Sequence, residues 1–295
     1  MPPRDLALAL VVILVWGMNF VVIKIGLHGI PPMLLGGIRF LLAAVPAIFF
    51  VRRPAIPLRW LVAYGATISL GQFAFLFTAM AVGMPAGLAS VVLQAQAFFT
   101  VALGALLLRE PFRAHNAVGL VVAAAGLALI GAEGGAGMTT MGFVLTLCAA
   151  LMWGLGNIAT KKAGKADMLG LVVWGSLVPP LPFFALSWWL EGPDRIHAAL
   201  ASIDGSSVFA VVYLSFVATL VGYGLWAWLM SRYPAAQVAP FSLLIPVIGL
   251  AAAAALLGEM PTAPQVGGAV LVMVGLLINT FGRRRGQGTL SGTVR

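Results

Sequence analysis

Two apolar stretches of this sequence carry the same arrangement of aromatic, polar and basic residues. The first reads LVWGMNFVVIK at 14–24 and the second LMWGLGNIATK at 151–161, so Leu, Trp, Gly and Lys recur in register. An amide inside an apolar helix can bind a carboxylate or join two helices, and an indole ring can bind an ammonium group over its face. The candidate cavity residues in these stretches are Trp16, Asn19, Trp153 and Asn157. The alternative is that the amides hold helices together and the indoles fill volume.

Other polar and aromatic side chains lie within apolar stretches and could line the same cavity. Tyr223 and Trp226 share one helix face at a spacing of three residues, so they would form an aromatic wall. Gln72 and Gln94 could hydrogen-bond a zwitterion, although bonds between helices are the favoured interpretation. On a continuous helix Gln94 and Gln96 would lie about 200° apart, so only one of them would face the cavity.

Arg39 is the charge placed furthest into an apolar stretch, about 10 Å from its outer end at the helical rise per residue. Its guanidinium could meet a substrate carboxylate. Such a side chain more often extends to the membrane interface or bonds backbone carbonyls, and we favour that structural role. Pro246 lies inside another apolar stretch and predicts a kink, which could be a hinge or a static bend. Glu110 and Glu259 each precede a helix at the membrane edge and are interpreted as structural caps.

Residues that would support other chemistries are missing from the apolar stretches. All eight acidic residues and all three histidines fall in loops or at the ends of apolar stretches. That distribution argues against a buried proton relay and favours facilitated, gradient-driven movement of a solute. The sequence has no HExxH motif and no GxxxxGK[ST] loop, so we expect neither an enzyme nor an ATPase. The single cysteine, Cys148, excludes an intramolecular disulfide and a cysteine-based metal cluster, and we predict no metal or other cofactor.

The composition is typical of a membrane protein. The 295 residues are 61% hydrophobic and only 8% charged, whereas about a quarter of a soluble domain is charged. A spanning helix needs about 20 mostly apolar residues, and the sequence predicts an all-α integral membrane protein with ten such helices. The predicted spans are 6–27, 33–51, 58–80, 86–108, 114–132, 141–161, 168–190, 207–230, 235–257 and 263–282. The net charge of +9 is scattered between these spans, so it forms no basic face for nucleic acid.

The distribution of Lys and Arg predicts how the chain is oriented. If the N-terminus is inside and the spans alternate, only Lys24, Arg39 and Arg195 of the seventeen basic residues fall outside. Basic residues favour the cytoplasmic side, so both termini are predicted to be cytoplasmic, in the inner membrane of a bacterium. The N-terminal apolar stretch lacks a cleavage site at the right distance, so we interpret it as the first span.

The chain is predicted to consist of two five-helix repeats, 1–135 and 136–295, the second ending in a basic tail. A shift of 137 residues places the first span on the sixth, and a shift of 149 places 85–131 on 234–280 without a gap. The second alignment pairs Pro85 with Pro234, Glu110 with Glu259, Gly119 with Gly268, and Gly126 with Gly275. Since five is odd, the second repeat would enter the membrane from the opposite side. Inverted repeats are typical of secondary transporters that work by alternating access and bind substrate near the bilayer midplane.

Three segments of the chain resemble a known transporter family. LLLREPFRAHNAVGLVVAAAGLALI and AALLGEMPTAPQVGGAVLVMVGLLI resemble the paired hallmark of the EamA-type drug/metabolite transporters, and GGIRFLLAAV in the second span resembles the same family. The resemblance covers nearly the whole chain. It implies ten helices in two inverted repeats, and export of amino acids or related metabolites. Bacterial aromatic amino-acid exporters are similar in these features.

Other functions stay open from the sequence. A multidrug exporter or a carrier of sugar phosphates or nucleotide-type metabolites is the second choice, although phosphate would require several cavity cations and the chain offers Arg39 at best. A channel or a lipid scramblase is a more distant alternative. The expected partners are a small-molecule substrate and membrane lipids, and the sequence predicts no particular oligomeric state.

Overall fold

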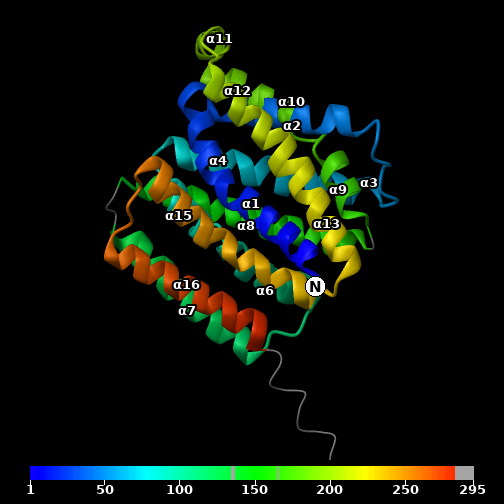
Figure 1. Ribbon diagram of the computed structural model, residues 1–295, viewed down its shortest axis with the longest axis vertical. Coiled ribbons are helices and arrows are strands. Elements are labelled where there is room, and N and C mark those ends of the chain that lie inside the picture. The colour runs from blue at the N-terminus through cyan, green and yellow to red at the C-terminus, as the bar shows by residue number, and fades with distance from the viewer. Residues whose placement is uncertain (134–136, 165, 283–295) are drawn as a thin grey trace, which may run out of the picture.

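The computed structural model describes residues 1–133, 137–164 and 166–282, and all regular secondary structure in these ranges is helical (Figure 1). The elements up to residue 133 are α1 (Pro3–Gly29), α2 (Pro32–Ala47), α3 (Leu58–Tyr64), the π-helix η1 (Gly65–Gly71), α4 (Gln72–Ala81), α5 (Ala86–Val92), α6 (Ala95–Leu108) and α7 (Ala114–Glu133). Those that follow are α8 (Thr140–Ala163), α9 (Met168–Gly175), α10 (Pro180–Leu186), the π-helix η2 (Ser187–Glu191), α11 (Pro193–Ala201), α12 (Gly205–Val212), the π-helix η3 (Tyr213–Val221), α13 (Gly222–Arg232), α14 (Ala235–Val238), the 3₁₀-helix η4 (Ala239–Leu244), α15 (Ile245–Leu257) and α16 (Ala263–Phe281). The predicted basic tail 283–295, Lys165 and the repeat boundary at 135–136 lie outside the described residues.

The all-α membrane architecture is confirmed. Within the described ranges, nine helical segments are long and apolar enough to cross a bilayer, and they correspond to nine of the ten predicted spans. The predicted span 33–51 corresponds to the shorter α2, which has 16 residues and ends at Ala47. Helices suit a bilayer because they satisfy their backbone hydrogen bonds internally. Proline opens several of them, α1, α2, α10 and α16, at positions whose N–H would have no partner in the helix.

Several spans change their helix type along their length. The third span runs from α3 through η1 to α4, and the eighth runs from α12 through η3 to α13. The fourth span breaks at Leu93 and Gln94, so the angle predicted between Gln94 and Gln96 on one continuous helix does not apply. In the ninth span, Pro246 lies in the first turn of α15, directly after η4. Pro246 therefore marks a change from 3₁₀ to α geometry, and its role as a hinge stays a prediction.

The helices α7 and α16 pack closely along most of their length, and Figure 1 shows them side by side at one edge of the molecule. A Cβ at Gly119 would lie 2.8 Å from the Gly275 carbonyl oxygen, and a Cβ at Gly126 would lie 2.5 Å from that of Gly268. The order of these contacts makes the two helices antiparallel. Glycine is required here because the backbones touch.

The helix α1 lies inside the bundle, where it packs against α15, α12, α13 and α5. Its residues from Phe20 to Ile23 belong to the main apolar core, which also includes side chains of α2, α4, α5 and α8. This central place lets the aromatic and polar residues of α1 meet those of the eighth span.

Candidate functional site

An aromatic cluster joins α1 to the eighth span. The ring of Trp16 lies 5.0 Å from that of Tyr223 and 5.4 Å from that of Trp226, measured between centroids. The Trp16 indole Nε1 donates a 3.0 Å hydrogen bond to the Ala218 carbonyl oxygen, within η3. Gly222 leaves room for the indole, since a Cβ there would lie 2.6 Å from Nε1. The structure thus brings Trp16 together with two residues that lie about two hundred positions later in the sequence, and the role of all three in substrate binding stays a prediction.

Arg39 lies on α2 and is buried against the eighth span, with only 3% of its surface exposed. Its guanidinium carbon lies 4.0 Å from the centroid of the Phe73 ring, in a cation–π contact. Its Nη2 donates a long hydrogen bond of 3.4 Å to the Thr219 hydroxyl oxygen. The expectation that Arg39 extends to the membrane interface is wrong, because aromatic rings from α2 and α4 enclose its guanidinium.

Unpartnered polar atoms gather in the same part of the bundle. Within the described residues, the buried side-chain nitrogen and oxygen atoms without a hydrogen-bond partner are Asn19 Oδ1, Arg39 Nε, Arg39 Nη1 and Ser215 Oγ. They come from α1, α2 and η3, which pack against one another. Buried polar groups are normally hydrogen-bonded, so this concentration requires an explanation. The sequence indicated Asn19 and Arg39 but gave no signal for Ser215 or Thr219, since small hydroxyl residues are common in membrane helices.

Asn157 makes hydrogen bonds between helices. Its amide nitrogen donates to Gln96 Oε1 at 3.1 Å and to Thr100 Oγ1 at 2.9 Å, which joins α8 to α6. These hydrogen bonds support the alternative in which Asn157 holds two helices together. Trp153, one turn earlier on α8, is half-buried against the main core.

The two glutamines among the predicted cavity residues, Gln72 and Gln94, lie in different environments. Gln72 is buried at the start of α4, and Gln94 is half-buried at the start of α6. Neither is part of the aromatic cluster around Trp16.

A polar cleft lies where α6, α7, α8 and α16 meet. Its volume is about 480 Å³, and it is lined by Val101, Glu110, Pro111, Arg113, His115, Asn116, Lys161, Asn279 and Thr280. Lys161 Nζ and Glu110 Oε2 form an ion pair of 2.7 Å across it, with both side chains about two-fifths exposed. Asn116 Nδ2 donates to Asn279 Oδ1 at 2.7 Å and joins α7 to α16.

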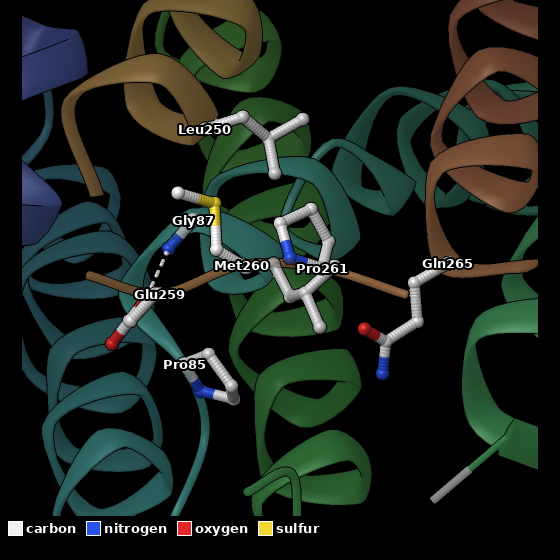
Figure 2. A pocket seen from close by; sticks show the side chains of 8 residues that line it. Pro85, Gly87, Leu250, Glu259, Met260, Pro261 and Gln265 are labelled. Atoms are coloured by element: carbon white, nitrogen blue, oxygen red, sulfur yellow. Dashed lines mark hydrogen bonds between the residues drawn. The ribbon is translucent and has the colours of Figure 1, made fainter. Parts of the chain in front are cut away.

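A second, much smaller cavity of about 20 Å³ lies around Glu259. Its carboxylate accepts a 3.1 Å hydrogen bond from the Gly87 backbone N–H, in the first turn of α5 (Figure 2). Leu88, Leu250 and Met260 are among the side chains that fill the space around it. Sequence reasoning interpreted Glu110 and Glu259 as caps; it did not foresee that each lines a cavity.

The chain is similar to several known proteins over almost its whole length. The model of the EamA-like transporter family matches residues 5–132 and 140–281. A protein of Salmonella typhimurium named probable amino-acid metabolite efflux pump is 54% identical over 290 residues, which cover 96% of this chain and 97% of that protein. An Escherichia coli K12 protein of the same name is 50% identical over the same shares of both chains. A solved crystal structure covering 98% of this chain and 100% of its own has a TM-score of 0.65 at 19% identity, which supports the fold alone.

Proposed function

Because the chain belongs to the EamA-like transporter family, we infer that it is a secondary transporter that exports amino acids or related metabolites from a bacterial cell. The observation that carries this conclusion is the high identity, over almost the full length, to two proteins named amino-acid metabolite efflux pumps. The chain is a multi-pass membrane protein and a transporter, not an enzyme. We place it in the inner membrane with both termini in the cytoplasm, on the distribution of Lys and Arg.

The proposed mechanism is alternating access between two inverted five-helix repeats. Self-complementary contacts between α7 and α16 support this, because Gly119 meets Gly275 while Gly126 meets Gly268, and the 149-residue shift relates the two pairs. An approximate two-fold axis produces such reciprocal contacts. The π-helices in the third and eighth spans occupy matching places in the proposed repeats.

Helix ends in the fourth and ninth spans give further support. Arg109 and Gly258, which the same shift relates, both end their helices in the left-handed conformation, with φ of 55° and 68°. The following residues repeat one hydrogen bond: Glu110 N–H donates to the Gly104 carbonyl oxygen, and Glu259 N–H to that of Ala253.

The two cavities occupy equivalent places in the proposed repeats, because the 149-residue shift relates Glu110 to Glu259 and Asn116 to Gln265. Their volumes of about 480 Å³ and about 20 Å³ differ widely. We propose that this conformation is open on the cytoplasmic side at Glu110 and closed on the outer side at Glu259. Exchange of the two arrangements would carry substrate across the membrane.

Transport of radiolabelled amino acids by the purified protein in liposomes tests this function. We expect saturable flux with trans-stimulation, which a channel would lack, and no uphill uptake when a pH gradient is imposed. Trp16→Ala and Tyr223→Ala should reduce flux by lowering affinity for the substrate. Asn157→Ala should act mainly on stability, because Asn157 joins α8 to α6. If no amino acid in a complete panel moves, the assignment is wrong.

A further inference from the structure

An incompletely bonded guanidinium lies inside the bundle. Arg39 is 3% exposed, and among the residues that the structure describes its only hydrogen-bond partner is Thr219, in the long bond. Within the described ranges, no carboxylate lies within ion-pair distance of it. A buried charge without a partner of opposite sign is strongly unfavourable, and the Phe73 ring compensates only part of this. The environment of Arg39 is therefore incomplete without an anionic group.

The side chain of Asn19 points toward the same region. Asn19 precedes Gly26 by two helical turns and therefore shares its face of α1. A Cβ at Gly26 would lie 3.1 Å from Ala210 of α12 and 3.2 Å from Leu35 of α2. Trp16, one turn before Asn19, bonds the Ala218 carbonyl. Asn19 therefore lies opposite the stretch between residues 210 and 218, which contains Ser215.

The π-helix η3, which packs against α1 and α2, carries two buried hydroxyl residues. The Thr219 hydroxyl donates to the Leu214 carbonyl oxygen at 2.8 Å, a five-residue spacing that is typical of a π-turn, and still accepts from Arg39. Ser215, one turn earlier, is fully buried, and its hydroxyl has no partner in the described part of the chain. Unpartnered polar atoms of Arg39, Ser215 and Asn19 thus come from three helices that pack against one another.

This inference rests on the proposed function. We propose that Arg39 and Ser215 bind the carboxylate of the transported amino acid, and that Asn19 Oδ1, an acceptor, binds its ammonium group. The second N–H of Arg39 Nη2, together with Nε or Nη1 beside it, would donate to the two carboxylate oxygens, which is the strong, charge-assisted geometry that arginine favours. The Ser215 hydroxyl would add a third donor. The aromatic cluster of Trp16, on α1, and Tyr223, at the start of α13, follows in the same two spans, and an ammonium group could rest against these rings.

Flux measurements on two probes test this site. The probes are the fastest-moving amino acid of the liposome panel and its α-carboxamide, which keeps the ammonium group and side chain but has no carboxylate. We expect the wild type to transport the amino acid at least tenfold better than the carboxamide. Arg39→Gln should lower amino-acid flux at least tenfold and bring the ratio of the two fluxes close to one. Arg59→Gln, at an exposed arginine, is the matched control and should leave the ratio unchanged.

A second measurement keeps the proposal testable if Arg39→Gln does not fold. The free amino acid should raise the melting temperature of the wild-type protein in detergent, whereas the carboxamide should not. Arg39→Lys keeps the charge but loses the planar donors, so it should weaken this shift. An unchanged flux ratio in Arg39→Gln, or equal melting shifts from both probes, would overturn the carboxylate site. Failure of every amino acid to move in the wild type would instead overturn the proposed function.

Discussion

Removal of the Glu259 carboxylate should make the outer side of the transporter open more often. In the described conformation this carboxylate accepts a hydrogen bond from the Gly87 N–H beside the small cavity, which we have proposed to lie on the outer side. Its proposed counterpart, Glu110, instead pairs with Lys161 beside the large cleft. We call the opposite, outward-open state, in which the two repeats have exchanged their arrangements, the exchanged conformation. The 137-residue shift relates Lys24 to Lys161, so in that conformation Glu259 should pair with Lys24 as Glu110 now pairs with Lys161. Glu110 should then accept a bond from the backbone N–H at 236.

The size of the shift between the two conformations follows from the free energies of the two interactions that Glu259 makes in them. A hydrogen bond from a backbone N–H to a carboxylate contributes about 2 kcal/mol, and an exposed ion pair about 0.5 kcal/mol. Glu259→Ala therefore destabilises the described conformation by about 1.5 kcal/mol more than the exchanged one. That difference corresponds to about a tenfold rise in the population that is open to the outside. Glu110→Ala should have the opposite effect by the same reasoning.

The assay is the labelling rate of a cysteine in the outer cavity. Leu88 lines this cavity and is 2% exposed, so Leu88→Cys, combined with Cys148→Ser, should react only when the outer side opens. A membrane-impermeant maleimide added to right-side-out vesicles reports that minor population. We expect labelling about tenfold faster with Glu259→Ala and about tenfold slower with Glu110→Ala. If both substitutions change the rate in the same direction, the two carboxylates are not opposing gates.

Two further outcomes are expected from the structure. Gly126→Ala places a Cβ 2.5 Å from the Gly268 carbonyl oxygen, so it should lower stability by about 1–3 kcal/mol, seen as a lower melting temperature in detergent. Gly267→Ala, whose Cβ would lie 3.7 Å from Leu129, is the control, and equal effects would contradict close backbone packing. Hydrogen bonds from Ser207 and Ser206 lower the pKa of Asp204 from 3.8 to about 2, so its cap on α12 should stabilise the helix above about pH 4 and weaken as pH falls toward 2. Hydrogen exchange at the Ser207 amide measures this, and an equal pH dependence in Asp204→Asn would refute it.

The sequence predicted the membrane class and most spans because both depend on long apolar runs, a local property. It also predicted that Tyr223 and Trp226 share a face, since their spacing is set within one helix. It could not predict that Arg39 is buried, because the enclosing Phe73 and the hydroxyl of Thr219 come from other spans. A sequence shows the depth of a charge in its helix, whereas its exposure depends on which helices lie beside it.

The breaks within spans were missed for a different reason. A π-turn holds one residue more than an α-turn, and such a residue changes neither composition nor hydropathy. The sequence favoured hydrogen bonds between helices for the glutamines, but it could not show that Gln96 pairs with Asn157, because that pairing depends on how α6 packs against α8. The two cavities at Glu110 and Glu259 depend on how whole helices pack against one another, and no local sequence pattern specifies that packing.

The surplus residue in η3 is absorbed within the helix, because a π-turn widens to hold it. Each residue turns an α-helix by about 100°, so the same residues wound as a regular α-helix would turn Tyr223 and Trp226 about a quarter-turn away from Trp16. The aromatic groups of this span therefore meet α1 only as long as η3 keeps its π geometry. A change of winding in this short segment would thus move side chains that it does not itself contain.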